Sequence, residues 1–93
     1  MTWYVYILSC SNHGYYVGHT HDLLARFALH QHGKGAQYTT QNRPSAILYH
    51  ESLPTELAAI RRERQLKCWS RAKKEALIAG DRARVHELSK SRD

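Results

Sequence analysis

The chain has 93 residues, of which 42% are apolar and 24% are charged, and its formal net charge is +6. This length suits one domain, and no apolar run approaches the roughly 20 residues that a membrane-spanning helix needs. The N-terminus lacks a signal-peptide pattern and two cysteines are too few for a disulfide framework, so we expect a cytoplasmic protein without a membrane partner. From Thr55 onward, eleven Lys and Arg residues stand against six Asp and Glu residues. This excess modestly favours nucleic acid as a partner over a basic surface that is merely solvated.

Two short apolar runs near the N-terminus predict a β-hairpin. They cover residues 3–8 and 15–18 and are rich in the aromatic and β-branched residues that suit strands. The connector between them contains Ser, Asn and Gly, which favour turns. Alternation along the strands allows Tyr6 and Tyr16 to come together beside Gly18, which leaves room for a ligand.

The rest of the chain predicts one more strand and four helices. Asp22, or Thr20 as the alternative, caps a helix that ends at Gly33, and residues 33–45 resemble a polar loop. Residues 46–52 predict the third strand. The later helices are expected over residues 56–68, 71–79 and 82–88, with polar caps at Thr55, Ser70 and Asp81, and residues 89–93 are expected to fray. The order ββαβααα predicts an α+β fold, a small three-stranded antiparallel sheet flanked by helices.

Several segments together resemble one known family. Tyr4-Val5-Tyr6 followed by Tyr16-Val17-Gly18 resembles the paired tripeptides of the GIY-YIG nuclease superfamily, and the likeness continues through Arg26, His30 and Glu63. The order of these residues is similar to that of the small, single-domain bacterial branch of the UPF0213 type. The resemblance covers about residues 3 to 78. It implies a nuclease domain over residues 1–80, with residues 81–93 as a helical extension and tail of the same domain.

Glu63 is the carboxylate with the most informative position. Helical spacing places it with the apolar residues of its helix and away from the outer face of Arg61 and Arg62. A carboxylate that faces a core is costly unless it is paired or binds a metal. Two interpretations follow: a buried salt bridge to Arg26 or Lys67, or a site for Mg²⁺ or Mn²⁺. A single inward carboxylate suits Mg²⁺, which keeps several waters and commonly takes substrate phosphate as a further ligand.

The family resemblance implies roles for further residues. It suggests Tyr6 and Tyr16 as catalytic phenols, one of which helps to deprotonate the attacking water, although core packing is the ordinary fate of strand tyrosines. Arg26 would stabilise the transition state, or form an ordinary salt bridge. His30 would relay a proton or hydrogen-bond the tyrosine, or be a surface histidine. The expected substrate-binding residues are Gly18, Lys34, Arg43, Lys67 and Arg71.

Three classes of function remain open from the sequence. The leading one is a metal-dependent endonuclease that acts on nucleic acid, DNA more readily than RNA, as a monomer or weak homodimer. The others are a nucleic-acid-binding module with weak or no cleavage, and a protein-interaction domain. A zinc site is a further alternative, because the chain contains Cys10-x-x-His13, His19-x-His21, His30-x-His32 and Cys68, but no paired ligand spacing of a structural zinc site repeats.

Overall fold

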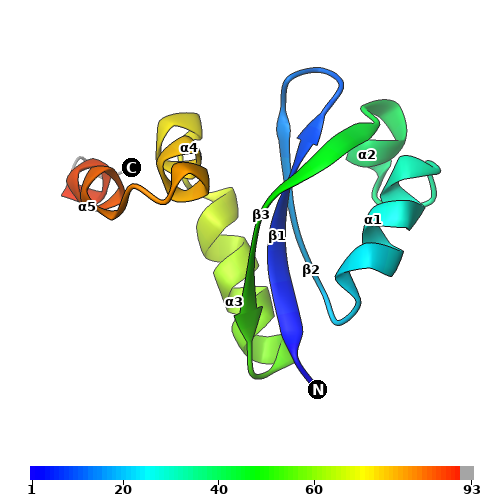
Figure 1. The fold of residues 1–93 in the computed structure, drawn as a ribbon, viewed down its shortest axis with the longest axis horizontal. Helices are drawn as coiled ribbons and strands as arrows, with labels where there is room; N and C mark the ends of the chain where they lie inside the picture. The colour runs from blue at the N-terminus through cyan, green and yellow to red at the C-terminus, as the bar shows by residue number, and fades with distance from the viewer. Residues whose placement is uncertain (91–93) are drawn as a thin grey trace. The chain divides into compact units, whose positions relative to one another are not determined.

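The elements follow the predicted order with one addition. The structure, a computed structural model, describes residues 1–90, so residues 91–93 of the predicted frayed tail lie outside the described part. The elements are β1 (Trp3–Cys10), β2 (Tyr15–Thr20), α1 (Leu23–Gln31), α2 (Gln37–Gln41), β3 (Pro44–Leu53), α3 (Glu56–Lys67), α4 (Arg71–Ala79) and α5 (Arg82–Lys90) (Figure 1). The addition is the short helix α2, which forms inside the segment predicted as a loop. The α+β class is confirmed.

The three strands form one antiparallel sheet in the order β2-β1-β3. The central position of β1 buries its middle residues, and Val5, Ile7 and Leu8 have no exposed surface. In the register between β1 and β2, Tyr6 lies opposite Gly18 and Leu8 lies opposite Tyr16. Directly opposed residues share a face of a sheet, so this register places both tyrosines and Gly18 on one face, as the alternation predicted.

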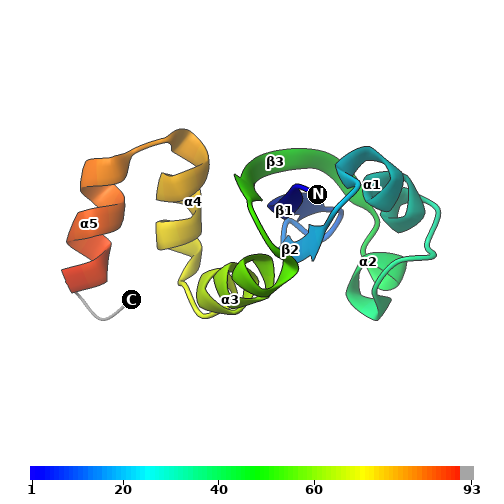
Figure 2. The same cartoon turned by 90° about the horizontal axis from the view of Figure 1, so that it is seen from below.

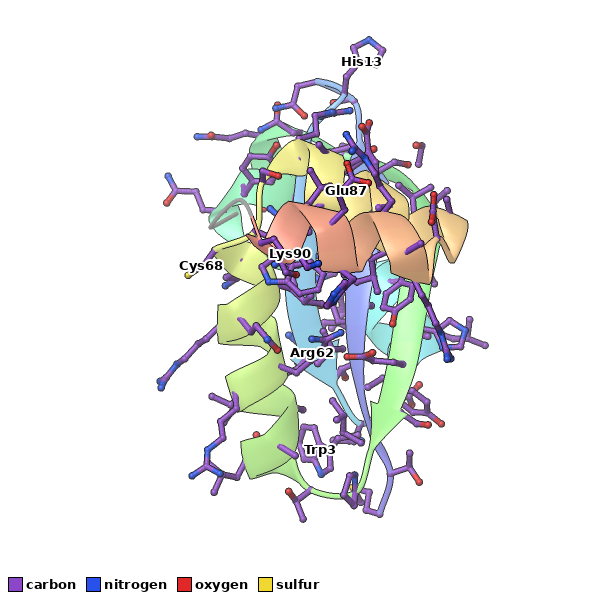
Figure 3. The ribbon with its side chains drawn as sticks, turned by 90° about the vertical axis from the view of Figure 1, so that its left-hand side faces the viewer. Trp3, His13, Arg62, Cys68, Glu87 and Lys90 are labelled. Atoms are coloured by element: carbon purple, nitrogen blue, oxygen red, sulfur yellow. The ribbon has the colours of Figure 1, made fainter. Side chains whose placement is uncertain are left out.

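Helices lie on both sides of this sheet. Residues Met1–Glu63 form one compact unit and Arg64–Asp93 a second. Within the first unit, the part of α3 up to Glu63 lies on one side of the strands, and α1 and α2 lie on the other (Figures 1 and 2). Arg62 of α3 points toward the sheet, where it pairs with Glu51 of β3 (Figure 3). The prediction that Arg62 belongs to the outer face of its helix was therefore wrong.

The predicted helix caps are confirmed. The Asp22 side chain accepts a hydrogen bond from the Ala25 N–H at 3.2 Å, so Asp22 rather than Thr20 caps α1. The side chains of Thr55, Ser70 and Asp81 accept equivalent bonds at the starts of α3, α4 and α5. Gly80 ends α4 with φ of 74°, a left-handed conformation that glycine adopts without a steric penalty.

The second unit carries most of its cationic side chains on the surface. An exception is Lys73 of α4, which is 5% exposed and has its Nζ 4.1 Å from the centre of the Trp69 ring, a cation–π contact. Among residues 1–90, no helix combines the length and the apolar character that a bilayer crossing needs.

Candidate active site

A buried hydrogen bond joins the first strand to the first helix. The Tyr6 hydroxyl lies 2.9 Å from Nε2 of His30, and the two residues are 2% and 1% exposed. His30 is the last-turn residue of α1 that faces the sheet, and its other ring nitrogen, Nδ1, lies 2.7 Å from the Thr39 hydroxyl of α2. The predicted pairing of His30 with a catalytic tyrosine is therefore a direct contact in the structure, made to Tyr6.

Tyr16 completes an aromatic cluster around this pair. Its ring centre lies 6.4 Å from that of Tyr6 and 5.0 Å from that of His30. On its other side it stacks with Tyr38 of α2, with 6.2 Å between centres and 21° between planes. The Tyr38 hydroxyl is held by Asn12 of the β1–β2 loop. The two predicted phenols therefore share one site, which α1 and α2 cover.

Gly18 makes this arrangement possible, in a different way from the one predicted. A side chain at this position would lie 2.7 Å from Cζ of Tyr6 and 3.0 Å from Cε2 of Tyr16. Real Cβ atoms essentially never approach heavy atoms more closely than 3.0 Å. The space above Gly18, expected to admit a ligand, is thus occupied by the Tyr6 phenol itself.

The electrostatics of the cluster keep both members of the hydrogen bond neutral. Burial raises the pKa of Tyr6 far above its ordinary value of 10, with a further rise from Tyr16 and from the charge of Glu63, while Arg26 acts in the opposite direction. Burial and the nearby Arg26 lower the pKa of His30 below its ordinary value of 6.5. At neutral pH the pair is therefore a protonated phenol and an uncharged imidazole.

Arg26 supplies an accessible positive charge to this site. It lies one turn before His30 on α1, is exposed, and is close enough to shift the pKa values of both Tyr6 and His30. Within residues 1–90, its guanidinium has no hydrogen-bond or ion-pair partner, so the salt bridge considered from the sequence does not form there. An exposed guanidinium with free donors can fork onto two phosphate oxygens.

Glu63 approaches from α3, on the other side of the sheet. Its side chain is 16% exposed, and Oε1 lies 2.8 Å from Nδ1 of His19 on the edge strand β2. Nε2 of His19 lies 3.7 Å from Oε2 of Glu56, a residue about two helical turns before Glu63 on α3. Glu63 therefore forms a hydrogen bond with His19, a partner not considered from the sequence, and its charge still reaches Tyr6.

The donor set fits Mg²⁺ or Mn²⁺ better than zinc. Residues 1–90 contain no group of three or more His, Cys, Asp or Glu side chains able to hold a metal ion together. Zinc needs three or four such ligands, whereas Mg²⁺ commonly takes one or two carboxylates, water and substrate phosphate. A carboxylate that is 16% exposed and hydrogen-bonded to His19 matches the second pattern.

The predicted substrate-binding residues fall in different places. Lys34 is exposed in the loop after α1. The Arg43 guanidinium donates hydrogen bonds to the backbone carbonyls of Gln31 at 2.8 Å and Thr40 at 3.3 Å, and so joins α1 to α2. Lys67 and Arg71 are exposed residues of the second unit. Phosphate contacts by these four residues stay predictions.

Sequence reasoning missed three residues that shape the site. Thr39 binds His30, His19 binds Glu63, and Gly35 packs against the His30 ring so closely that a Cβ there would lie 2.7 Å from Cε1. The spacing of Gly33 and Gly35 was the one local signal available, because it marks a segment where the backbone approaches something closely. Thr39 and His19 carry no such signal, since their partners lie 9 and 44 positions away.

Comparison with known proteins gives a consistent result. Residues 2–76 match the GIY-YIG catalytic domain. A UPF0213 protein of Bacillus pumilus is 41% identical over 75 residues, 81% of this chain and 76% of that protein. A UPF0213 protein of the archaeon Natronomonas pharaonis is 41% identical over 78 residues, 84% of this chain and 92% of that protein. The solution structure of a UPF0213 protein of Bacillus halodurans is similar, with 39% identity, a TM-score of 0.54 and coverage of 85% of this chain and 84% of that one.

Proposed function

The chain belongs to the GIY-YIG catalytic-domain family, and from this premise we propose that it is a metal-dependent endonuclease that hydrolyses phosphodiester bonds in nucleic acid, with DNA as the expected substrate. The observation that carries the proposal is the buried bond between Tyr6 and His30, beside Tyr16 and within the electrostatic reach of Arg26 and Glu63. Four residues of types suited to phosphodiester chemistry, Tyr16, Arg26, His30 and Glu63, thus act on the Tyr6 phenol.

The proposed reaction begins with a water molecule next to the Tyr6 hydroxyl. Tyr6 passes its proton to Nε2 of His30, the resulting phenolate takes a proton from the water, and the hydroxide that forms attacks phosphorus. The geometry that supports this step is the 2.9 Å separation of Oη and Nε2, which lies within the range for direct proton transfer. Tyr16, in ring contact with both residues, is placed to orient the water or the phosphate.

Negative charge develops on the phosphate during the reaction, and Arg26 and a metal ion bound by Glu63 would stabilise it. The Arg26 guanidinium would bind the phosphate oxygens, where charge increases as the hydroxide attacks. Glu63, held by His19, would bind Mg²⁺ or Mn²⁺, which when bound would supply positive charge for the phosphate and for the leaving oxygen. Lys34, Arg43, Lys67 and Arg71 are further candidates for contacts with substrate phosphates.

A panel of labelled substrates tests the proposal. Branched, single-stranded and duplex DNA and RNA are incubated with the protein and Mg²⁺, Mn²⁺ or a chelator, and the products are resolved by length. We expect metal-dependent scission of at least one substrate, lost by at least about a hundredfold in Arg26→Ala and in Glu63→Gln. Arg84→Ala and Glu87→Gln are matched controls, because these two exposed residues of α5 form only a surface ion pair with each other.

The outcomes of this panel separate the candidate functions. Scission that survives both site variants at the level of the controls would contradict the proposed site. Salt-sensitive binding without scission by the wild-type protein would identify a nucleic-acid-binding module instead. Absence of both binding and scission on every substrate would contradict the nucleic-acid function as a whole.

A further inference from the structure

A chain of three hydrogen bonds extends from the catalytic phenol to the backbone of α2. Tyr6 Oη lies 2.9 Å from His30 Nε2, His30 Nδ1 lies 2.7 Å from Thr39 Oγ1, and Thr39 Oγ1 lies 2.9 Å from the Ala36 carbonyl oxygen. Thr39 is fully buried, and Tyr6 and His30 are 2% and 1% exposed. Buried polar groups must satisfy one another, so the direction of each bond can be worked out from the donors available.

The Ala36 carbonyl fixes the direction of its bond with Thr39. A carbonyl oxygen accepts only, so Thr39 donates its single hydroxyl proton to Ala36. The Ala36 carbonyl also receives the Thr40 N–H at 3.0 Å. The Thr40 hydroxyl lies 3.1 Å from the Ala36 carbonyl and 3.0 Å from the Gly33 carbonyl, so its proton has an acceptor for which Thr39 does not compete. With its proton committed to Ala36, the Thr39 oxygen can only accept from His30. Nδ1 of His30 therefore carries the ring proton.

The Tyr6 hydroxyl also favours a proton on Nδ1 of His30 rather than on Nε2. Among residues 1–90, the Tyr6 hydroxyl makes one hydrogen bond, to His30. If Nε2 carried the proton, Nε2 would donate to the phenol oxygen and the phenol proton would have no acceptor in that part of the chain. With Nε2 unprotonated, the phenol donates to it and every group is satisfied.

We propose that Thr39 is a positioning residue that holds His30 in the Nδ1–H tautomer and so leaves Nε2 free to accept the Tyr6 proton. Its hydroxyl can serve only as an acceptor toward His30 because its own proton is committed to the backbone. In the other neutral tautomer, Thr39 would have to turn its proton from the Ala36 carbonyl to Nδ1, and the Tyr6 proton would have no acceptor among residues 1–90. The catalytic consequence rests on the proposed nuclease function, whereas the tautomer is a property of the folded protein by itself.

Gly35 leaves the space that the His30 ring occupies. Its missing side chain leaves just enough space for the imidazole, since a Cβ there would lie 2.7 Å from Cε1 and 2.9 Å from Cγ of His30. A flip of the ring about its Cβ–Cγ bond would exchange nitrogen and carbon positions and place a carbon against Thr39. The hydrogen bonds to Tyr6 and Thr39 thus fix the orientation of the ring, and the committed proton of Thr39 fixes its tautomer.

The tautomer is measured by NMR of ¹⁵N-labelled protein, through the shifts of the two ring nitrogens and their couplings to ring protons. The His30 signals are assigned by comparison with His30→Gln. We expect a protonated Nδ1 and an unprotonated Nε2 at neutral pH in the wild-type protein and in Thr39→Ser, which keeps the hydroxyl. Thr39→Val is nearly isosteric but offers no acceptor, so we expect the ratio of tautomers to move toward Nε2–H by about tenfold or more.

Each result decides the proposal without requiring cleavage. A wild-type ring with the proton on Nε2 would overturn it, and so would a ratio that is the same in Thr39→Val and the wild-type protein. If Thr39→Val does not fold, the wild-type ring and Thr39→Ser still give the answer. Where cleavage is detected, Thr39→Ser should retain the wild-type rate and Thr39→Val should lose about tenfold. Absence of cleavage would bear on the proposed function and leave the tautomer result intact.

Discussion

The tightest packing in the site lies between Gly18 and the Tyr6 phenol, and it can be tested by adding one methyl group. In Gly18→Ala the new Cβ would lie 2.7 Å from Cζ of Tyr6, whereas ordinary contact begins at 3.4 Å. The ring must therefore retreat by about 0.7 Å within a core that has little free volume. That displacement stretches the 2.9 Å bond to His30 beyond the normal range.

The expected loss of stability follows from these two effects. Overpacking a well-filled core costs about 1–3 kcal/mol, and a buried acceptor left without its donor costs about 1–3 kcal/mol more. Replacement of glycine by alanine returns about 0.4–1 kcal/mol through the lower entropy of the unfolded chain. We therefore expect Gly18→Ala to lower the free energy of unfolding by about 1–5 kcal/mol, measured by urea denaturation followed by circular dichroism.

A double-mutant cycle with Tyr6→Phe isolates the cause. In the phenylalanine background there is no bond to His30 for the methyl group to break, and the atom nearest to the new Cβ is absent. Gly18→Ala should then cost at least about 1 kcal/mol less than it does in the wild-type protein. Equal costs in the two backgrounds would refute the reasoning, because the loss would then have nothing to do with the phenol hydroxyl.

Three further predictions concern charge and protonation. Because the pKa of His30 is lowered on folding, the unfolded chain takes up a proton first as the pH falls, so stability is complete above about pH 6.5 and decreases below it by up to about 1.4 kcal/mol per pH unit. Urea denaturation at several pH values should show a shallower decrease for His30→Gln, and identical slopes would contradict the pKa direction. Burial and the hydrogen bond to Glu51 raise the pKa of Tyr49 to about 12, so in an ultraviolet titration Glu51→Gln should lower the pH at which this tyrosine ionises. If cleavage is detected, Arg26→Lys should reduce it by about a hundredfold, since a single ammonium cannot replace the bidentate guanidinium, while Arg84→Lys should leave it unchanged.

The sequence predicted those parts of the molecule that depend on local rules. The caps at Asp22 and Ser70 follow from side chains that satisfy free N–H groups within three residues, a relation that is fully contained in the sequence. The shared face of Tyr6 and Tyr16 follows from strand alternation and the hairpin. The family resemblance then brought in Arg26 and Glu63 from segments that local rules could not connect.

The parts that were missed depend on how distant segments pack. Helix α2 is five residues long and its N-cap, Ala36, makes no side-chain cap, so nothing local distinguished it from a loop. Without α2, no partner for the second ring nitrogen of His30 could be named. Arg62 was assigned to the outer face because a helical wheel cannot show that β3 brings Glu51 beside that face. The contacts that support the site from distant segments therefore could not be predicted from the sequence and had to be read from the structure.

Burial of the Tyr6–His30 pair explains why the proposed proton transfer would be confined to the substrate-bound protein. Transfer creates a phenolate and an imidazolium, and burial disfavours both, as the opposite pKa shifts of the two residues indicate. Arg26 favours the phenolate and disfavours the imidazolium, so by itself it does not favour the charge-separated pair. A phosphodiester bound to Arg26 would cancel the positive charge that opposes the imidazolium, and Thr39 would already hold Nδ1 as a donor, so that Nε2 needs no rearrangement to receive the proton. The resting site is thus neutral and stable because the group that completes its electrostatics is the substrate itself.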